Sequence, residues 1–326
     1  MRKPIAALVS NQIGSVRTVY GEKQLAELRE LCQLKEPFVT QESVDSGILD
    51  DVEVIFSTWG MIPFTDEQLE RMKKLKVIFY AAGATEYFSL KPLQHGILVS
   101  SAWQANGLPV AEYTVAQILL GLKNYFILTR NYRSADGYNH AGKGRGAYGA
   151  RIGLIGDGAI STHVQRLLKN FSLETMVIPT DPAKWTEGNF EEMFRTCQVV
   201  SNHLPDRDDM VGILNRKLFE LLPKKGIFIN TGRGRQVNEP ELAEVLARRI
   251  DLSALLDVTF PEPPAPESPL YSLPNVFLSP HLAGSVNDEC HRMADYMLDE
   301  CRRYLKNEPL QYEVKMEYLL NLLNLK

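Results

Sequence analysis

The sequence has 326 residues, 44 % of them hydrophobic, and a formal net charge of −4. A chain of this length and composition can bury two hydrophobic cores, so we expect two domains. No long basic run is present, which disfavours a nucleic-acid partner. The longest apolar stretch, residues 108–130, is broken by Glu112 and Lys123, so it predicts a buried helix and no membrane partner.

The four cysteines are scattered and form no C-x-x-C pair. This spacing predicts neither a disulfide scaffold nor a metal site, so we expect no metal cofactor. The apolar run within residues 1–12 is too short for a secretion signal, and we interpret it as a buried strand. These features together predict a cytoplasmic protein.

Short β-rich runs alternate with helix-like stretches through the first hundred residues. We predict strands at residues 5–10, 52–58, 75–82 and 96–102, with helices at residues 22–32, 65–74 and 89–95. This alternation is typical of a parallel sheet with crossover helices. The first hundred residues therefore predict one α/β unit.

A second series of elements follows. We predict a helix from about residue 109 to 130, and then an arm at residues 134–150 that is too rich in glycine and polar residues for regular structure. Six further strands are predicted at residues 151–156, 174–179, 197–202, 226–231, 252–258 and 275–280. Six strands with helices between them are what a doubly wound dinucleotide-binding fold requires.

The end of the chain carries two more signals. Residues 261–269, "PEPPAPESP", must form a loop, because proline cannot donate to a sheet ladder. Beyond Ser285 the apolar residues recur with helical spacing, which predicts a long amphipathic helix. Residues 312–326 are compatible with either a strand or a helix.

The stretch "IGLIGDGAIST", residues 152–162, reads as a strand, a glycine turn and a helix. Gly156 and Gly158 supply two glycines of the G-x-G-x-x-G pattern, and Ser161 stands at the third position. Glycines there let backbone N–H groups at a helix start reach a pyrophosphate, and serine is small enough for the helix to pack. Taken alone, the motif is equally compatible with a tight turn that binds nothing.

An acidic residue after the next predicted strand favours the cofactor interpretation. Asp181 follows Ser161 by twenty residues, where a carboxylate can accept hydrogen bonds from an adenosine ribose. The same charge would repel the 2′-phosphate of NADP, so we predict NAD, with NADP less favoured. Lys184 lies close by and leaves NADP open.

Three successive predicted strands end in residues suited to one reaction. Arg233 follows the first, Asp257 and then Glu262 follow the second, and His281 follows the third. Hydride exchange with a hydroxy acid needs an anchor for the carboxylate, an acid/base for the hydroxyl proton and a partner that orients that base. Arg233, His281 and Glu262 meet these needs in that order. For His203, also at a strand end, we favour structural packing.

The ordered motifs resemble those of the D-isomer-specific 2-hydroxyacid dehydrogenases, a family that includes phosphoglycerate, D-lactate and glyoxylate/hydroxypyruvate enzymes. The resemblance covers residues from about 75 to 305 and is carried by "GLPVAEYTVAQIL", "GLIGDGAIS", "PTDP", "NHLP", "NTGRGRQVNEPELAEVL", "LDVTFPEPP" and "LSPHLAGS". It implies that Arg233, Glu262 and His281 are catalytic, with His281 as the proton donor or acceptor. It also implies cofactor contacts at Gly156, Gly158, Ala159, Ile160, Asp181, Pro205, Thr231, Gly232, Asp257 (toward the nicotinamide amide) and Gly284.

The resemblance also implies an architecture and an assembly. The fold class is α/β with two doubly wound domains, a Rossmann NAD-binding domain inserted into a flavodoxin-like substrate domain. We place the discontinuous substrate domain at residues 1–103 plus 286–326 and the dinucleotide-binding domain at residues 104–285. Residues 109–150, a helix and an arm, are then expected at the interface of a homodimer.

The loops of the first domain depart from the family pattern. Residues 81–88 read "AAGATEYF", and the backbone at Ala82, Gly83 and Ala84 is expected to bind the substrate carboxylate. Trp59, in "STWGM", and Tyr87 are expected to shape the pocket for the rest of the substrate, although packing in the core or under a lid explains these aromatic residues equally well. The physiological substrate therefore stays open.

The sequence predicts an NAD-dependent oxidoreductase that interconverts a 2-keto acid and a D-2-hydroxy acid. One alternative is an NAD(H)-sensing binding protein on the same fold, since a fold does not fix a function. A second alternative is a formate dehydrogenase. The formate enzymes resemble a variant with glutamine at the glutamate position, so Glu262 argues against it.

Overall fold

The computed structural model describes residues 2–139 and 142–323 and divides the chain into two compact units. Unit 1 comprises residues 1–107 and 285–326, and unit 2 comprises residues 108–284. The chain therefore crosses between the units after Gly107 and after Gly284, whereas the sequence places these crossings after residues 103 and 285. Each unit is described separately below.

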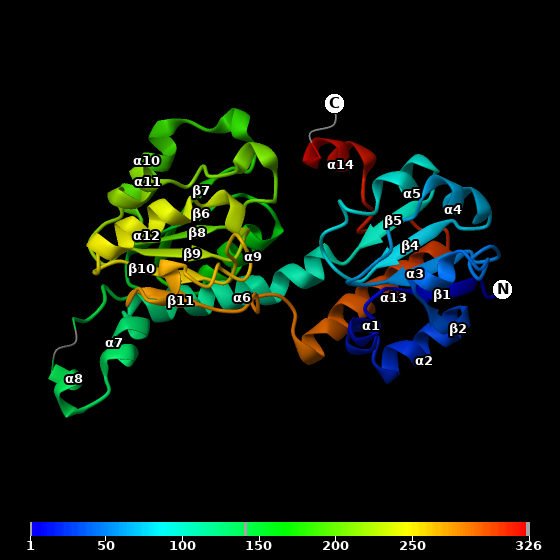
Figure 1. Cartoon of the computed structure of the whole chain (residues 1–326), viewed down its shortest axis with the longest axis horizontal. Coiled ribbons are helices and arrows are strands. Elements are labelled where there is room, and N and C mark those ends of the chain that lie inside the picture. Colours follow the sequence, from blue (N-terminus) through cyan, green and yellow to red (C-terminus); the bar gives the residue numbers. More distant parts are fainter. Residues whose placement is uncertain (1, 140–141, 324–326) are drawn as a thin grey trace. The chain divides into compact units, whose positions relative to one another are not determined.

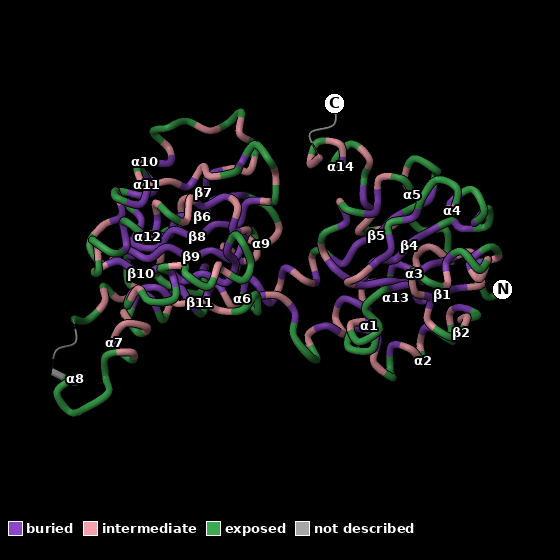
Figure 2. Tube along the Cα trace, in the orientation of Figure 1, coloured by how far each residue is buried: buried purple, intermediate pink, exposed green. Residues whose placement is uncertain are grey.

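Unit 1 is built on a five-stranded parallel sheet with the order β2-β1-β3-β4-β5 (Figure 1). The strands are β1 Ile5–Val9, β2 Gln33–Val39, β3 Val54–Ser57, β4 Val77–Tyr80 and β5 Leu98–Ser101. This is the strand order of flavodoxin-like folds, and it confirms the expected class. All residues of β3 and β4 are buried, as expected for central parallel strands covered by helices on both faces (Figure 2).

Strand β2 is absent from the sequence-based prediction. Its residues, "QLKEPFV", include Pro37 and three charged or amide side chains, and most of them are partly or fully exposed. The strand lies at the edge of the sheet, pairs only with β1, and its register shifts between Ala7 and Val9. Proline and charged residues are tolerated on such an edge, so this strand lacks the apolar pattern that marks the others.

The C-terminal segment completes unit 1. Helix α13, His291–Leu305, buries Met293, Met297 and Cys301 in the unit 1 core, which confirms the predicted amphipathic helix. The buried carboxylate of Glu300 accepts hydrogen bonds from Ser100 and from two backbone N–H groups of residues 311 and 312. The ambiguous tail forms helix α14, Met316–Leu322. The other helices of unit 1 are α1 Ile13–Val19, α2 Glu22–Leu31, α3 Gln41–Val44, α4 Asp66–Arg71 and α5 Leu90–Gln94.

Unit 2 contains the predicted six parallel strands, in the order β11-β10-β9-β8-β6-β7. They are β6 Ala150–Ile155, β7 Leu173–Ile178, β8 Val199–Asn202, β9 Ile227–Asn230, β10 Ser253–Leu256 and β11 Val276–Leu278. The helices between them are α9 Ala159–Leu168, α10 Glu187–Thr196, α11 Arg216–Leu221 and α12 Glu239–Arg248. This parallel α/β architecture confirms the predicted dinucleotide-binding fold class.

One edge of the unit 2 sheet is shortened. In the doubly wound order 3-2-1-4-5-6 a third strand pairs with the second, but here β7 is the edge strand of the described sheet. The chain between β7 and α10 contains only a 3-10 turn at Pro182–Lys184, which leaves no length for another strand. Strand β7 is accordingly more exposed than β6.

The segment at 109–130 forms two helices instead of one. Helix α6, Trp103–Leu122, begins six residues earlier than predicted and runs through Pro109. It ends where Asn124 takes a left-handed conformation with φ 61°, and α7, Tyr125–Asn131, follows. Across residues 2–139 and 142–323, no helix is long and apolar enough to cross a membrane.

The arm differs from the expectation that it has no regular element. Residues Ala135–Asn139 form the short helix α8, with Asp136 in its first turn, where a negative charge is favourable. In Figure 1, α7 and α8 extend away from the unit 2 sheet. Residues 140 and 141 of the arm lie outside the described residues.

Candidate active site and cofactor site

The glycine turn after β6 has the geometry that a dinucleotide requires. Gly156 has φ 101°, and a Cβ atom there would lie 2.9 Å from the carbonyl oxygen of His203. A Cβ atom on Gly158 would meet no atom within 4 Å, so this side of the turn faces open space. The first glycine is therefore required by conformation and packing, and the second leaves room for a phosphate to approach the backbone.

Helix α9 begins directly after this turn. The first N–H groups of a helix have no partner within it, so those of Ala159 and Ile160 are directed at the space beside Gly158. Ser161 is fully buried, and its hydroxyl oxygen has no hydrogen-bond partner among the described residues. Serine thus fills the position of the third glycine as a small packed side chain. These features fit a bound pyrophosphate.

Asp157 fastens the glycine turn to the end of β7. Its backbone N–H donates to Thr180 Oγ1 at 3.1 Å, and its carboxylate accepts from the Thr180 N–H at 2.9 Å. The hydrogen bond that the Thr180 N–H donates to the carboxylate is the main reason that the pKa of Asp157 lies below its usual range. Asp181 directly follows Thr180 and is half-exposed. Its carboxylate accepts a hydrogen bond from the Ala183 N–H at 3.0 Å and lies 3.9 Å from Lys184 Nζ. The contact between Asp157 and Thr180, which holds the glycine turn, therefore also positions Asp181.

Three buried amide side chains, unrecognised in the sequence, organise the loops after β8 and β9. Asn202 donates to Asn230 Oδ1 at 3.0 Å and to Gln236 Oε1 at 2.6 Å. Gln236 donates in turn to the carbonyl groups of Leu204 and Pro205, and Asn230 donates to the Arg233 carbonyl. Because each amide both donates and accepts, the network fixes the two loops relative to each other. Its only sequence signal is polar residues at buried strand ends.

Arg233 lies on the loop after β9, as predicted. Its guanidinium donates to the Gly232 carbonyl at 2.8 Å, and Asn238 caps the following helix by accepting from the Glu241 N–H at 3.3 Å. A Cβ atom on Gly234 would lie 2.0 Å from the Thr259 carbonyl carbon, so the two loops are in backbone contact. The arginine loop therefore packs against the loop that carries Glu262.

The structure brings His281 and Glu262 together. Nδ1 of His281 lies 2.6 Å from Oε1 of Glu262, and both side chains are about half-exposed. Strands β10 and β11 are parallel neighbours, so the loops that carry the two residues leave the same edge of the sheet. With Nδ1 facing the carboxylate, Nε2 of His281 remains the ring nitrogen for another partner.

Asp257 lies directly after β10, and its carboxylate is buried. It is 3 % exposed, and its two oxygens accept from the backbone N–H groups of Leu282 and Ala283, each at 3.0 Å, and from Ser279 Oγ at 2.6 Å. The carboxylate thus lies at the centre of the turn that carries His281. Oδ1 takes two of these hydrogen bonds and Oδ2 takes one, so Oδ2 keeps accepting capacity for the nicotinamide amide contact that the family resemblance implies.

The other predicted cofactor residues flank this region. Pro205 accepts from Gln236, Thr231 is buried, and the Gly232 N–H donates to Asn230 Oδ1 at 3.1 Å. Gly284 is the last residue of unit 2. All of them except Gly284 lie at the ends of β8 and β9, which places them on the same edge as Arg233.

His203 has the environment of a structural residue. It is almost fully buried, with Nε2 3.0 Å from Ser201 Oγ and Nδ1 3.4 Å from Thr231 Oγ1. Burial lowers the pKa of His203 to about 4, so the ring is neutral at physiological pH. A ring that stays neutral between hydroxyl partners supports the predicted packing role.

The predicted substrate-binding residues lie at the carboxyl edge of the unit 1 sheet. Ser101 Oγ donates to the carbonyl groups of Ala82 and Gly83 at 2.8 and 2.9 Å. Because C=O and N–H point in opposite directions in a trans peptide, the N–H groups of Gly83 and Ala84 are turned away from Ser101. This loop therefore presents backbone donors, as binding of a carboxylate requires.

The two predicted pocket aromatics differ in burial. Trp59 is partly buried and packs against the unit 1 core, whereas Tyr87 is 50 % exposed. The Tyr87 hydroxyl lies 3.2 Å from that of Tyr80, and its ring packs edge-on against Phe88. Tyr87 is thus the more accessible of the two.

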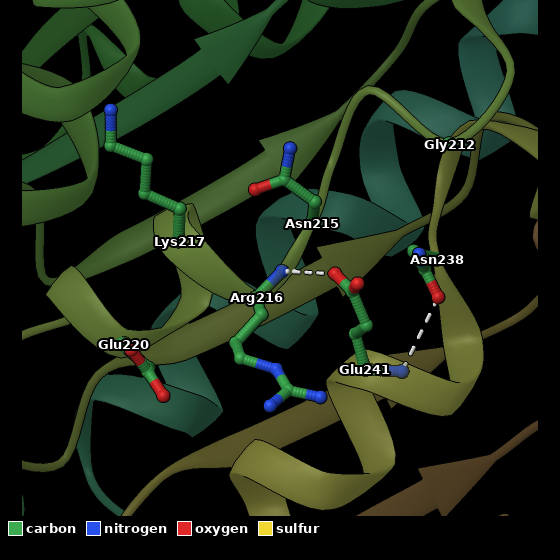
Figure 3. Close-up of a pocket in the computed structure, with 7 residues that line it drawn as sticks. All are labelled: Gly212, Asn215, Arg216, Lys217, Glu220, Asn238 and Glu241. Carbon is green, nitrogen blue, oxygen red and sulfur yellow. Dashed lines mark hydrogen bonds between the residues drawn. The ribbon is translucent and has the colours of Figure 1, made fainter.

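A separate pocket of about 550 Å³ lies between α11 and α12 (Figure 3). It is lined by Gly212, Asn215, Arg216, Lys217, Glu220, Asn238 and Glu241. Two hydrogen bonds join lining residues: Glu241 accepts from the Arg216 N–H at 2.8 Å, and the Glu241 N–H donates to Asn238 Oδ1 at 3.3 Å. None of the predicted site residues lines this pocket, so it is not the candidate active site.

A parallel sheet whose first strand runs through a glycine turn into a helix is the fold of the dinucleotide-dependent dehydrogenases. A sequence profile described as "D-isomer specific 2-hydroxyacid dehydrogenase, NAD binding domain" matches residues 115–283, just over half of the chain. The chain therefore belongs to the D-isomer specific 2-hydroxyacid dehydrogenase family. It is an NAD-dependent enzyme.

Comparisons with individual proteins agree with this assignment. A glyoxylate/hydroxypyruvate reductase of Arabidopsis thaliana is 27 % identical over 79 % of this chain and 82 % of its own length. A formate dehydrogenase of Chaetomium thermophilum is 29 % identical over 76 % of this chain and 72 % of its own. The crystal structure of the TT0316 protein of Thermus thermophilus is similar with a TM-score of 0.72 at 26 % identity, covering 95 % of this chain and 100 % of that one. The chain spans about half the length of some other curated relatives.

Glu239 generates a prediction about stability. Its Oε1 accepts from the Phe260 N–H at 2.7 Å, and burial raises the pKa of Glu239 to about 7 from 4.5. Folding therefore opposes ionisation, and the resulting loss of stability grows as the pH rises from 4.5 toward 7. Glu239→Gln keeps an oxygen acceptor for Phe260 and removes the charge. We expect this variant to have a higher Tm than the wild type near pH 8, with a difference that disappears near pH 4.

The matched control is Glu244→Gln, which alters an exposed carboxylate on the same helix. Thermal melts recorded across this pH range should show no pH-dependent gain for the control. Equal melting temperatures of wild type and Glu239→Gln at every pH would contradict the prediction.

Proposed function

We propose that this enzyme transfers a hydride between NAD(H) and a small acid, interconverting a 2-keto acid and a D-2-hydroxy acid. The observation that carries the proposal is the 2.6 Å contact between His281 Nδ1 and Glu262 Oε1. The pair lies on loops at the carboxyl edge of the unit 2 sheet, where the loop that carries Arg233 also begins. Gly234 packs the Arg233 loop against Thr259. Carbonyl reduction needs an oriented acid/base and a cationic group for the substrate, and these loops supply an imidazole and a guanidinium at one edge of the sheet.

In the direction of reduction, NADH supplies the hydride to the carbonyl carbon of the keto acid. His281 donates a proton from Nε2 to the carbonyl oxygen, which becomes the hydroxyl of the product. Glu262 accepts a hydrogen bond from Nδ1–H, which fixes the ring orientation and stabilises the positive charge of the protonated ring. In the opposite direction, His281 removes the hydroxyl proton.

Arg233 and the loop after β4 are proposed to hold the substrate. A guanidinium binds a carboxylate through two parallel N–H donors and can also polarise a neighbouring carbonyl oxygen. The N–H groups of Gly83 and Ala84, turned away from Ser101, are proposed as donors to a substrate carboxylate, together with the loop residue Ala82. Trp59 and Tyr87 would contact the remainder of the substrate, with Tyr87 the more exposed of the two.

The cofactor is proposed to bind along the carboxyl edge of the unit 2 sheet. Gly156, Gly158, Ala159 and Ile160 would hold the pyrophosphate, and Asp181 the adenosine ribose. The remaining proposed contacts are with Pro205, Thr231, Gly232, Asp257 and Gly284.

Formate oxidation is the second candidate, because a formate dehydrogenase is among the similar proteins. Formate lacks an oxygen that needs a proton during its conversion to carbon dioxide, so it does not require an acid/base pair. The close contact of Glu262 with His281 therefore favours the keto-acid reaction. A partner-binding NAD sensor would likewise have no need of this pair.

The test is a panel of glyoxylate, hydroxypyruvate, pyruvate and longer 2-keto acids, with NADH oxidation followed by absorbance. We expect turnover with at least one member and a D-2-hydroxy acid as its product. Tight NADH binding without turnover on any acid would favour the sensor. Reduction of NAD by formate without keto-acid activity would favour the formate enzyme.

His281→Ala should lower kcat with the best keto acid by about two to four orders of magnitude, because the proton donor is lost. Binding of NADH, measured by fluorescence titration, should change little. Ser272→Ala, an exposed change elsewhere in unit 2, is the control. An unchanged kcat in His281→Ala would remove this residue from the mechanism.

Asp181→Asn should shift the cofactor preference toward NADP. The substitution retains an oxygen that can accept from the Ala183 N–H and removes the charge that would repel a 2′-phosphate. We expect the ratio of kcat/KM for NADPH to that for NADH to rise about tenfold, the order of one screened like-charge contact. Asp208→Asn, an exposed carboxylate of the same unit, serves as control. A ratio unchanged in Asp181→Asn would discredit the ribose contact.

We also propose a homodimer that pairs through residues 109–150. Its support is a set of exposed aromatic side chains on this segment, which a partner surface would cover: Tyr125, Tyr132, Tyr138 and Tyr148. A cytoplasmic location belongs to the same proposal and is supported by four free, buried cysteines.

A further inference from the structure

We propose that Tyr113 and Ser279 are positioning residues for His281, acting through the buried Asp257 carboxylate. This inference rests on the proposed role of His281 in proton transfer. Neither Tyr113 nor Ser279 has a place in the mechanism given above, and both act on the histidine through hydrogen bonds within unit 2.

His281 is held in an unfavourable backbone conformation. Its φ of 52° lies in the left-handed region, which few residues other than glycine adopt, although asparagine, aspartate and histidine adopt it more often than the rest. Such a conformation persists only where the surrounding contacts determine it, and it is common at functional sites. The contacts that hold this turn therefore decide where the imidazole ring is presented.

Most of these contacts converge on Asp257. The His281 N–H donates to the Asp257 carbonyl at 3.0 Å, and the next two N–H groups along the turn donate to the Asp257 carboxylate. The carbonyl and the carboxylate of Asp257 together thus accept hydrogen bonds from three successive N–H groups. A rotation of the Asp257 carboxylate would release two of them and relax the turn.

The carboxylate itself is held by a chain of hydroxyl groups. Ser279 Oγ donates to Asp257 Oδ1 at 2.6 Å, and Tyr113 Oη donates to Ser279 Oγ at 2.9 Å. Each hydroxyl has a single proton, so the chain runs in one direction, from the helix to the carboxylate.

The chain anchors the turn to a rigid element. Tyr113 lies in the middle of the 20-residue helix α6, and the adjacent Thr114 is fully buried. Burial also raises the pKa of Tyr113 above its ordinary value, so its hydroxyl keeps its proton and remains a donor at neutral pH. The position of α6 is therefore transmitted through Ser279 and Asp257 to the His281 turn.

The experiment compares Tyr113→Phe, Ser279→Ala and Ser279→Thr with the control Ser272→Ala. The Ser272 hydroxyl donates to the Pro269 carbonyl in unit 2, and Ser272 lies on the loop before β11, outside the chain of hydroxyl groups. Ser279→Thr retains a hydroxyl and tests whether that hydroxyl restores kcat. Thermal melts establish that each variant is folded.

Two measurements are made on the full-length enzyme. The first is steady-state kinetics with the best keto acid, in which we expect kcat to fall about tenfold in Tyr113→Phe and more in Ser279→Ala, with the KM for NADH nearly unchanged. Ser279→Thr should restore most of the loss. The second is the ring ¹H–¹⁵N NMR spectrum of the histidines, in which the His281 signals, identified by their absence in His281→Ala, should shift or broaden in the first two variants alone.

The spectrum separates this inference from the proposed function. Unchanged His281 signals in both Tyr113→Phe and Ser279→Ala would overturn the inference, whatever the enzyme turns over. Changed signals with an unchanged kcat would also overturn it, since positioning would then have no catalytic effect. Absence of wild-type turnover on every keto acid would refute the proposed function, while changed signals would still show that the hydroxyl chain positions the ring.

Discussion

Parallel pairing of β9, β10 and β11 is the constraint on which the candidate site depends. Neighbouring parallel strands end at the same edge of a sheet, so the loops that follow them begin only one strand spacing apart. Arg233 and His281, which are almost fifty positions apart in the sequence, thereby lie on loops only two strand spacings apart, with the loop after β10 between them. Crossover helices such as α12 supply the separation in sequence without adding separation in space.

The loops at this edge are ordered by buried polar groups as well as by apolar packing. The amides of Asn202, Asn230 and Gln236 join two loops, and Asp257 holds a third. Such groups are costly to bury unless their hydrogen bonds are satisfied, and a satisfied network has little freedom to rearrange. Such rigidity suits a site in which a small displacement of the proton donor would slow the reaction.

The sequence predicted the elements that carry a periodic apolar pattern and the residues that belong to ordered motifs. All six strands of unit 2 were predicted, because the four central ones are continuously apolar and the edge strands β7 and β11 still carry short apolar runs, whereas the edge strand β2 was missed because its proline and charges interrupt any such run. The helix α8 was missed because a single helical turn leaves no periodicity to detect. The hydrogen bond between Tyr113 and Ser279 joins positions 166 apart, and no local sequence pattern can predict a contact that only the tertiary fold creates.

The two carboxylates that follow β10 show how burial separates roles within one loop. Asp257 is 3 % exposed and accepts hydrogen bonds from two backbone N–H groups and a hydroxyl, so its carboxylate holds the chain of the His281 turn. Glu262 is about half-exposed, and its close partner is the imidazole of His281. A carboxylate with one titratable partner can respond when that partner gains or loses a proton, whereas a carboxylate surrounded by fixed donors cannot change without releasing them. The same strand end therefore provides a rigid support and a responsive partner for one histidine, which is what repeated proton transfer at a fixed position requires.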